Sequence, residues 1–232
     1  MIAENVQNIR ENVKKTCERV GRDTQSVDLL AVSKTFSPEN VIEATKTGIV
    51  DFGENYVQEL LEKKDKCAEY PICWHFIGHL QSNKVKYISD WIYLIHSVDS
   101  NSLAAEIQKR AEKAKRDIDI LIEVNTSEEA TKFGVKPDKA LDLIKLVSGY
   151  SNIKLKGLMT IGPFTDVKEE SRKAFKTLKS IFDDANMFLK SQMTILSMGM
   201  THDFDIAIEE GSTMIRIGTA IFGSRNYSKE DV

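Results

Sequence analysis

The sequence is poor in the residues that mark several common classes of protein. It has only three cysteines, Cys17, Cys67 and Cys73, and none of them has C-x-x-C spacing. An odd number without that spacing argues against a disulfide framework and against a zinc site, so we interpret them as reduced, partly buried thiols. No stretch rich in proline, glycine and serine suggests a linker. We therefore expect residues 1–232 to form a single domain without a metal.

Charge and hydropathy exclude further classes. The chain has 32 Lys and Arg against 35 Asp and Glu, so it lacks the basic excess of a nucleic-acid-binding protein. It also lacks any run approaching the roughly 18 apolar residues of a membrane-spanning helix. The opening MIAENVQNIRENVKK has an acidic residue at Glu4 and no apolar segment, so it is not a signal peptide. We expect a cytoplasmic protein with no nucleic-acid and no membrane partner.

Short β-branched apolar runs recur along the chain, and each is followed by a polar segment with helical spacing. This alternation is typical of a parallel sheet covered by helices. The eight runs are VDLLAVSKT from Val27, IVDFGEN from Ile49, ICWHFIG from Ile72, WIYLIHSV from Trp91, DIDILIEVN from Asp117, LKGLMTIGP from Leu155, QMTILSMGM from Gln192 and STMIRIGTAIFG from Ser212.

Helix start signals lie between these runs. Ser37-Pro38-Glu39-Asn40, Asp99-Ser100-Asn101-Ser102 and Pro137 each place a polar cap or a proline before helix-forming residues. A further helix, about residues 2 to 20, precedes the first run. It has apolar residues near one face, namely Ile2, Val6, Ile9, Val13 and Val20, and we expect it to pack on the outside or bottom of the fold.

Eight strands, seven intervening helical segments and one leading helix predict a single (β/α)8 TIM-type barrel of the α/β class with an extra N-terminal helix. An open, doubly wound sheet is the alternative, because strand number alone does not show closure. No G-x-G-x-x-G follows the first strand to support a dinucleotide-binding fold of that kind.

The carboxyl ends of barrel strands form the active face, and reactive side chains occur at several of these ends. Lys34 directly follows the apolar run LLAV, and burial of its amine would lower its pKa, as imine formation requires. Taken alone, however, Lys34 is better explained as a strand-end lysine that reaches solvent. Weaker polar or soft candidates follow on other strands, namely His75, Ser97, Asp99, Glu123, Asn125, Met159 and Thr160.

The ends of the seventh and eighth strands are more informative. Ser197-Met198-Gly199-Met200-Thr201 and Arg216-Ile217-Gly218-Thr219-Ala220 each combine a hydroxyl with a glycine that lets backbone N–H groups approach an anion. Loops after strands 7 and 8 are the usual phosphate site of this fold. A phosphate site on one side and an amine on the other suggest a phosphorylated aldehyde as the ligand.

These motifs resemble those of the pyridoxal phosphate homeostasis proteins, isolated barrels similar to the N-terminal domain of alanine racemase. The resemblance covers about residues 2 to 225. It depends on LLAVSKT, FGENYVQE, WHFIGHLQSNK, SMGM followed by an acidic helix, and EEGSTMIRIGTAIFG. It implies pyridoxal 5′-phosphate (PLP) as cofactor.

The resemblance also assigns roles to particular residues. It implies a Schiff base on Lys34, with Asn55 and His75 in the cofactor pocket and Arg216 beside the pyridine nitrogen. The implied phosphate cradle consists of Ser197, Gly218 and Thr219, with Met198, Met200, Thr201 and Ile217 close to it. Arginine keeps its charge and disfavours protonation of the ring nitrogen, which weakens the cofactor as an electron sink.

Alanine racemase, by the same family comparison, adds a second domain that supplies a tyrosine acid/base from its partner subunit. Nothing after Arg225 could supply such a domain, so we expect a monomeric PLP carrier with no catalytic residue, able to deliver PLP to apo-enzymes. A PLP-dependent amino-acid racemase, transaminase or lyase is the alternative. A third interpretation is a barrel that has lost its cofactor and serves as an interaction module.

Overall fold

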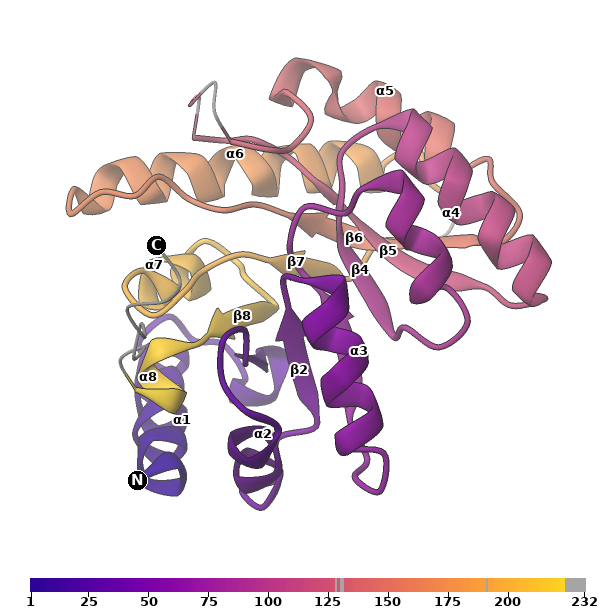
Figure 1. The fold of residues 1–232 in the computed structure, drawn as a ribbon. Coiled ribbons are helices and arrows are strands. Elements are labelled where there is room, and N and C mark those ends of the chain that lie inside the picture. Colours follow the sequence, from indigo (N-terminus) through magenta and orange to yellow (C-terminus); the bar gives the residue numbers. More distant parts are fainter. Residues whose placement is uncertain (128, 130–131, 191, 224–232) are drawn as a thin grey trace.

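Eight parallel strands close into one barrel in the computed structural model, which describes residues 1–127, 129, 132–190 and 192–223 (Figure 1). Each strand pairs with the next along the chain, and the last pairs with the first, so the predicted (β/α)8 barrel is confirmed over the open sheet. The strands are β1 (Asp28–Val32), β2 (Asp51–Glu54), β3 (Cys73–Phe76), β4 (Leu94–Val98), β5 (Ile118–Glu123), β6 (Ile153–Met159), β7 (Ile195–Ser197) and β8 (Met214–Ile217).

Helical segments connect the strands in the predicted alternation. Between β3 and β4 this segment is a 3₁₀ helix, η2 (Ser82–Tyr87), and another 3₁₀ helix, η1 (Thr24–Ser26), precedes β1. The α-helices are α1 (Ile2–Arg19), α2 (Pro38–Thr45), α3 (Val57–Lys66), α4 (Asn101–Ala114), α5 (Pro137–Val147), α6 (Lys168–Asn186), α7 (Phe204–Glu209) and α8 (Thr219–Phe222).

The predicted helix starts lie where the caps indicated. Ser37 precedes α2, and its backbone N–H donates to Asn40 Oδ1 at 3.3 Å. The Ser100 hydroxyl accepts from the backbone N–H of Leu103 at 3.5 Å at the start of α4. Pro137 begins α5. These local signals therefore set the points at which the chain leaves the barrel mouth and turns back along its outside.

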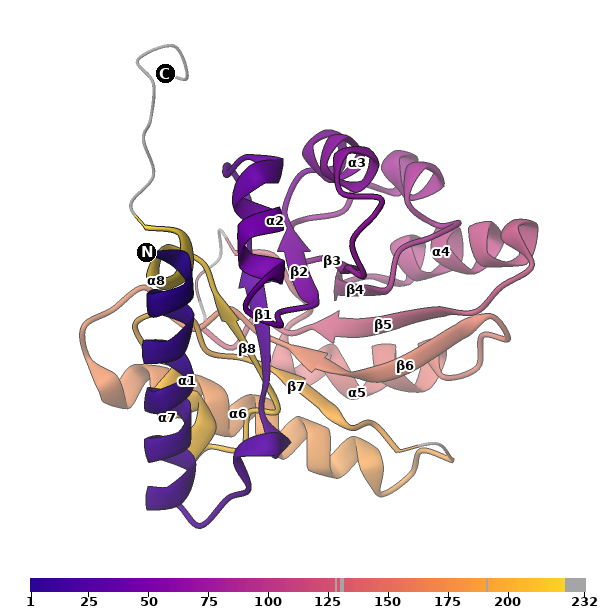
Figure 2. The same ribbon diagram turned by 90° about the horizontal axis from the view of Figure 1, so that it is seen from below.

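The leading helix α1 packs beside α7 and α8 on the outside of the barrel (Figures 1 and 2). Its buried face contains Ile2, Val6, Ile9 and Val13, as the sequence pattern predicts, whereas Val20 lies beyond the helix end and is 37% exposed. The helix thus covers the two elements that follow β7 and β8.

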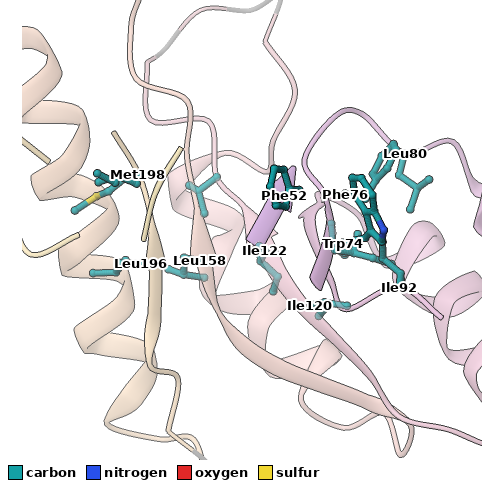
Figure 3. Close-up of a cluster of buried hydrophobic side chains, with 14 of the residues drawn as sticks. Phe52, Trp74, Phe76, Leu80, Ile92, Ile120, Ile122, Leu158, Leu196 and Met198 are labelled. Carbon is teal, nitrogen blue, oxygen red and sulfur yellow. The ribbon is translucent and has the colours of Figure 1, made fainter. Parts of the chain in front are cut away.

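The two faces of the strands bury different side chains, because successive residues of a strand point to opposite sides. The outward residues join the buried faces of the helices in the main core. Figure 3 shows part of it, including Phe52, Trp74, Phe76, Leu158 and Met198. Two small apolar clusters lie apart from this core, the first of Leu30, Val32, Ile77 and Met214 and the second of Leu94, Leu121 and Met159. They fill the barrel interior together with several polar groups.

Candidate functional site

A cavity of about 550 Å³ lies at the carboxyl ends of the strands. Most of its polar lining comes from the loops that follow β1, β2, β7 and β8. Seven of the residues proposed from the sequence line it together, namely Lys34, Asn55, Met200, Thr201, Arg216, Gly218 and Thr219. The fold therefore brings the predicted amine, arginine and hydroxyl groups to one site.

Lys34 is half-buried in the turn after β1, and the backbone on both sides of it is held by side chains from β2 and α3. The hydroxyl of Ser33 donates to a carboxylate on β2 at 2.6 Å. The backbone N–H of Thr35 donates to Glu59 Oε1 of α3, also at 2.6 Å. Thr35 has a φ of +69°, a left-handed conformation that is costly for a β-branched residue. The turn is thus built to present Lys34 in one place.

The carboxylate on β2 belongs to Glu54, which lies in a buried ionic network with Lys63. Lys63 is 2% exposed, and its Nζ donates to Glu54 Oε1 at 2.7 Å, to Glu59 Oε1 at 2.6 Å and to the Ser33 carbonyl at 2.6 Å. Burial raises the pKa of Glu54 to about 7, and Lys63 opposes this shift. We name Ser33, Glu54, Glu59 and Lys63 the outer network, because it lies between β2 and α3.

Asn55 follows β2 and faces the cavity beside a close backbone approach. A Cβ on Gly78 would lie only 2.3 Å from the Asn55 carbonyl oxygen, so the loop after β3 can pass there only with glycine. Among the described residues, the buried side-chain oxygen Oδ1 of Asn55 has no hydrogen-bond partner. It is an acceptor suited to a donor on a bound molecule.

Arg216 brings a buried positive charge to the floor of the cavity. It is 4% exposed, and its Nη1 donates to Ser197 Oγ at 2.8 Å and to the Ser197 carbonyl at 2.7 Å, while Nη2 donates to the Thr160 carbonyl at 2.8 Å. Burial lowers the pKa of Arg216 to about 10, whereas Asp203 and Glu123 raise it. The guanidinium therefore stays charged near neutral pH.

The loops after β7 and β8 meet on the far wall of the cavity. The Thr219 hydroxyl donates to the Thr201 hydroxyl at 3.4 Å, which brings the two predicted phosphate loops together. Gly199 has a φ of +94°, and a Cβ there would lie 2.5 Å from Ala207 Cβ. The Met200 N–H donates to Asp203 Oδ1 at 2.6 Å, so this loop is held by its own carboxylate.

Four of the residues proposed from the sequence do not line the cavity. The side chains of Met198 and Ile217 are fully buried in the main core between the strands and the helices, where Figure 3 shows Met198. Only their backbone groups can therefore face the loops. His75 and Ser197 are also fully buried, and their polar atoms bond to other side chains. Strand alternation explains the placement of Met198 and Ile217, because neighbouring residues point to opposite faces. His75 and Ser197 point into the barrel interior, but they do not reach the cavity lining.

Other groups at or below the cavity were weakly indicated or missed by the sequence. Glu123 and Thr160 were noted only as polar residues near strand ends, and burial raises the pKa of Glu123 to about 7. Asp203, 9% exposed, lies in the acidic helix segment that follows SMGM. His96 and Lys63 were not proposed, because one lies within an apolar run and the other on a charged helix, where neither has a local signal.

Two classes of feature are absent from the described part of the chain. Its His, Cys, Asp and Glu side chains form no group of three that could hold a metal ion. None of its helices combines the length and the apolar composition that crossing a membrane requires.

Comparisons with known proteins converge on one family. Residues 5–226 match the family model for the N-terminal domain of alanine racemase. The chain is 44% identical to the pyridoxal phosphate homeostasis protein of Aquifex aeolicus, over 97% of this chain and 98% of that protein. It is 35% identical to the protein of the same name in Escherichia coli K12, over 99% of each chain.

Solved structures share the barrel. PipY of Synechococcus elongatus with PLP bound superposes with a TM-score of 0.84 at 30% identity, over 96% of this chain and 100% of that one. Alanine racemase of Clostridium difficile has a TM-score of 0.74 at 17% identity, and the match covers 98% of this chain but 58% of the racemase. That second likeness concerns the fold alone. On its full-length relatives, the chain belongs to the pyridoxal phosphate homeostasis protein family.

Proposed function

We propose that this chain holds PLP as a Schiff base on Lys34 and acts in intracellular PLP homeostasis as a carrier with little or no catalysis. The observation that carries the proposal is the convergence of Lys34, Arg216, Thr201 and Thr219 on one cavity. Two further findings support it, namely the PLP bound in PipY and the name shared by the full-length relatives.

The cavity residues fit the chemical ends of PLP. The amine of Lys34 is the group that can bond the aldehyde carbon, with release of one water. Thr201 and Thr219 place hydroxyl donors on the opposite wall, and Gly218 leaves room for the backbone there. Asn55 Oδ1 offers a buried acceptor between these two ends. The lining thus contains a nucleophile, anion-binding donors and a further hydrogen-bond partner.

Arg216 is the residue that restrains catalysis. When bound, the cofactor supplies an aldehyde and a ring that can withdraw electrons. A charged guanidinium beside the ring nitrogen disfavours protonation there, and this reduces electron withdrawal. The carrier function also fits the comparisons, because the homeostasis proteins match over almost their whole length and the racemase over 58% of its own.

The direct test is a PLP titration of the purified protein followed by borohydride reduction and peptide mass analysis. We expect an imine absorbance band that saturates at one PLP per chain and a reduced adduct on Lys34. Lys34→Ala should abolish the adduct and keep some noncovalent binding through the threonine loops. Lys46→Ala, at an exposed lysine that ends α2, is the matched control and should behave as the wild type. An adduct on a different lysine, or none, would overturn the proposal.

The alternative is a PLP-dependent amino-acid racemase or a related amino-acid enzyme. The carboxyl of Asp203 favours it, because this group lines the cavity and burial raises its pKa, as a proton-transfer group requires. Steady turnover of one amino acid, well above the rate with free PLP and lost in Lys34→Ala, would support the enzyme over the carrier.

Two finer predictions belong to the carrier function. We expect the loaded protein to be a monomer, which sedimentation analysis measures, and to pass PLP to PLP-dependent apo-enzymes. Mixing the loaded carrier with an apo-enzyme should restore enzyme activity faster than the loaded carrier releases PLP into solution. Equal rates would contradict a delivery function.

A further inference from the structure

A chain of hydrogen bonds crosses the barrel interior beneath the cavity and ends on Arg216. His75 Nε2 lies 3.1 Å from Asp51 Oδ1, and His75 Nδ1 lies 2.9 Å from His96 Nε2. His96 Nδ1 lies 3.1 Å from Ser197 Oγ, to which Arg216 Nη1 donates at 2.8 Å. We name these five residues the inner chain. It connects residues from β2, β3, β4, β7 and β8, which are far apart in sequence.

The inner chain runs from one end of the barrel to the other. His75, His96 and Ser197 are fully buried and Arg216 nearly so, whereas the Asp51 side chain is 26% exposed at the amino end of β2. Arg216 lies at the opposite end, on the floor of the cavity. A buried polar chain of this length is favourable only when each member has a partner. Every link here meets that requirement within hydrogen-bond distance.

One arrangement of donors and acceptors satisfies every link of the inner chain, and it starts from the guanidinium, which only donates. Ser197 Oγ accepts from Arg216, and the same hydroxyl can donate its proton to an unprotonated His96 Nδ1. Burial, together with His75 and Arg216, lowers the pKa of His96 well below its usual value, so His96 is neutral. In this arrangement its one proton is on Nε2. That proton goes to His75 Nδ1 and leaves His75 Nε2–H to donate to Asp51.

All links therefore point the same way, from the guanidinium towards the carboxylate. Such alignment polarises each member and makes Ser197 Oγ a better acceptor for Arg216. This matters because no carboxylate of the described residues lies within ion-pair distance of Arg216, and its direct partners are carbonyl oxygens and one hydroxyl. The negative end of the chain is three side chains away, at Asp51.

We propose that His75 and His96 are positioning residues for Arg216, which they tie to Asp51 so that its charge keeps one orientation beside the cofactor ring. The inference rests on the proposed function only in that Arg216 faces the ring. His75, which the family resemblance placed in the cofactor pocket, acts in this proposal two side chains away from Arg216.

The first test uses the protein without cofactor, so it does not depend on PLP binding. Long-range ¹H–¹⁵N spectra distinguish the two neutral tautomers of a histidine, and the other two histidines, His79 and His202, can be assigned by substitution. We expect His75 and His96 to carry their protons on Nε2. Ser197→Ala removes the donor to His96 Nδ1 and should alter the His96 signals while the protein remains folded. A proton on His96 Nδ1 in the wild type would overturn the proposal.

The second test measures the effect of the remote end on the cofactor. Asp51→Asn keeps the side-chain shape but removes the charge, and we expect PLP affinity to fall about threefold to tenfold. The pH dependence of the imine absorbance should shift with it, and Asp51→Glu should restore part of both. Asp28→Asn is the matched control, because Asp28 lies exposed at the start of β1 beside Asp51 and is not a link in the chain.

These outcomes separate the inference from the proposed function. Equal PLP affinity and equal spectra for Asp51→Asn and Asp28→Asn would overturn the positioning role even if PLP binds. If the wild type did not bind PLP, the proposed function would fail. The histidine tautomers of the protein without cofactor would still decide whether the hydrogen bonds of the inner chain all point the same way.

Discussion

The outer network behind Lys34 and the inner chain beneath Arg216 solve a similar problem in different ways. Both hold a residue that lines the cavity through buried polar partners, Lys34 in the first case and Arg216 in the second. The outer network does so by direct ion pairs, with Lys63 Nζ 2.6–2.7 Å from two carboxylates. The inner chain separates its carboxylate and its guanidinium by two imidazoles and a hydroxyl. One holds a backbone turn, and the other holds a side chain.

The strand β2 supplies both systems, and this explains how they differ. Asp51 and Glu54 are three residues apart, so they point to opposite faces of the strand. Glu54 faces α3, which can bring a lysine and a second carboxylate. Asp51 faces the barrel interior, where the neighbouring strands offer histidines. On the helix side of the barrel opposite charges therefore meet directly, whereas in the interior neutral side chains connect the charged Arg216 to the carboxylate of Asp51.

The largest expected effect comes from removing the centre of the outer network. Lys63→Met leaves Glu54 buried without its cation, and removal of one partner of a buried ion pair costs about 3–5 kcal/mol. We expect the free energy of unfolding, measured with urea at pH 8, to fall by that amount. The turn at Lys34 also loses its anchor on the Ser33 carbonyl, so imine formation should weaken as well.

Lys64→Met is the matched control for this prediction. Lys64 is the next residue on α3, and its side chain is 39% exposed. Within the described part of the chain it pairs only with the exposed Asp65 and the ring of Trp91. Its loss should change stability by less than about 1 kcal/mol. Equal destabilisation by the two substitutions would show that the outer network contributes no more than a surface lysine does.

An intermediate effect should appear in the pH dependence of stability, through Glu123, a buried carboxyl group whose charge interacts with Arg216. The folded-state pKa of Glu123 is raised to about 7 by burial, with Asp99 adding to the rise and Arg216 opposing it. A raised carboxyl pKa means that the folded state holds the proton more tightly, so the contribution of Glu123 to stability is fully present below about pH 4.5 and is lost as pH rises through 7. Glu123→Gln should reduce the loss of stability between pH 4.5 and 8 by about 2–3 kcal/mol.

Urea denaturation at several pH values measures this change, and Glu43→Gln on the exposed face of α2 is its control. The Glu123→Gln variant should still lose some stability over this pH range through Glu54, whose pKa is also about 7. If Glu123→Gln and Glu43→Gln gave the same profile as the wild type, the carboxyl of Glu123 would not be held protonated by burial.

The smallest effect concerns the backbone that the outer network holds. Thr35 adopts a left-handed φ of +69°. Its hydrogen bond to Glu59 is donated by the backbone N–H and does not involve the Thr35 side chain. Thr35→Gly removes the steric cost of this conformation and should raise the free energy of unfolding by about 1 kcal/mol. Thr35→Ala keeps the Cβ and should give no such gain. A loss of stability in the glycine variant would mean that the side chain of Thr35, rather than the network, holds the turn.

Much of the fold and part of the site could be predicted from the sequence. Apolar runs marked all eight strands, and Ser37 and Pro137 marked helix starts, because hydrophobic periodicity and capping depend on residues close together in the chain. The same reasoning placed Lys34 and Gly218 at strand ends, where the fold does bring them to one cavity. The family resemblance, rather than the periodicity, indicated PLP.

Only the tertiary structure decided which of these residues meet, and across which face. His75 contacts His96, which lies 21 residues further on, and His96 contacts Ser197, which lies 101 residues after it. Lys63 donates to the carbonyl of Ser33, which lies 30 residues earlier in the sequence, at the turn that carries Lys34. The sequence by itself determined the elements, the amine and the glycine loops. Strand pairing and closure of the barrel decided the partners of the buried charges. His96 and Ser197, for example, belong to β4 and β7, which are not neighbours in the sheet and meet only across the barrel interior.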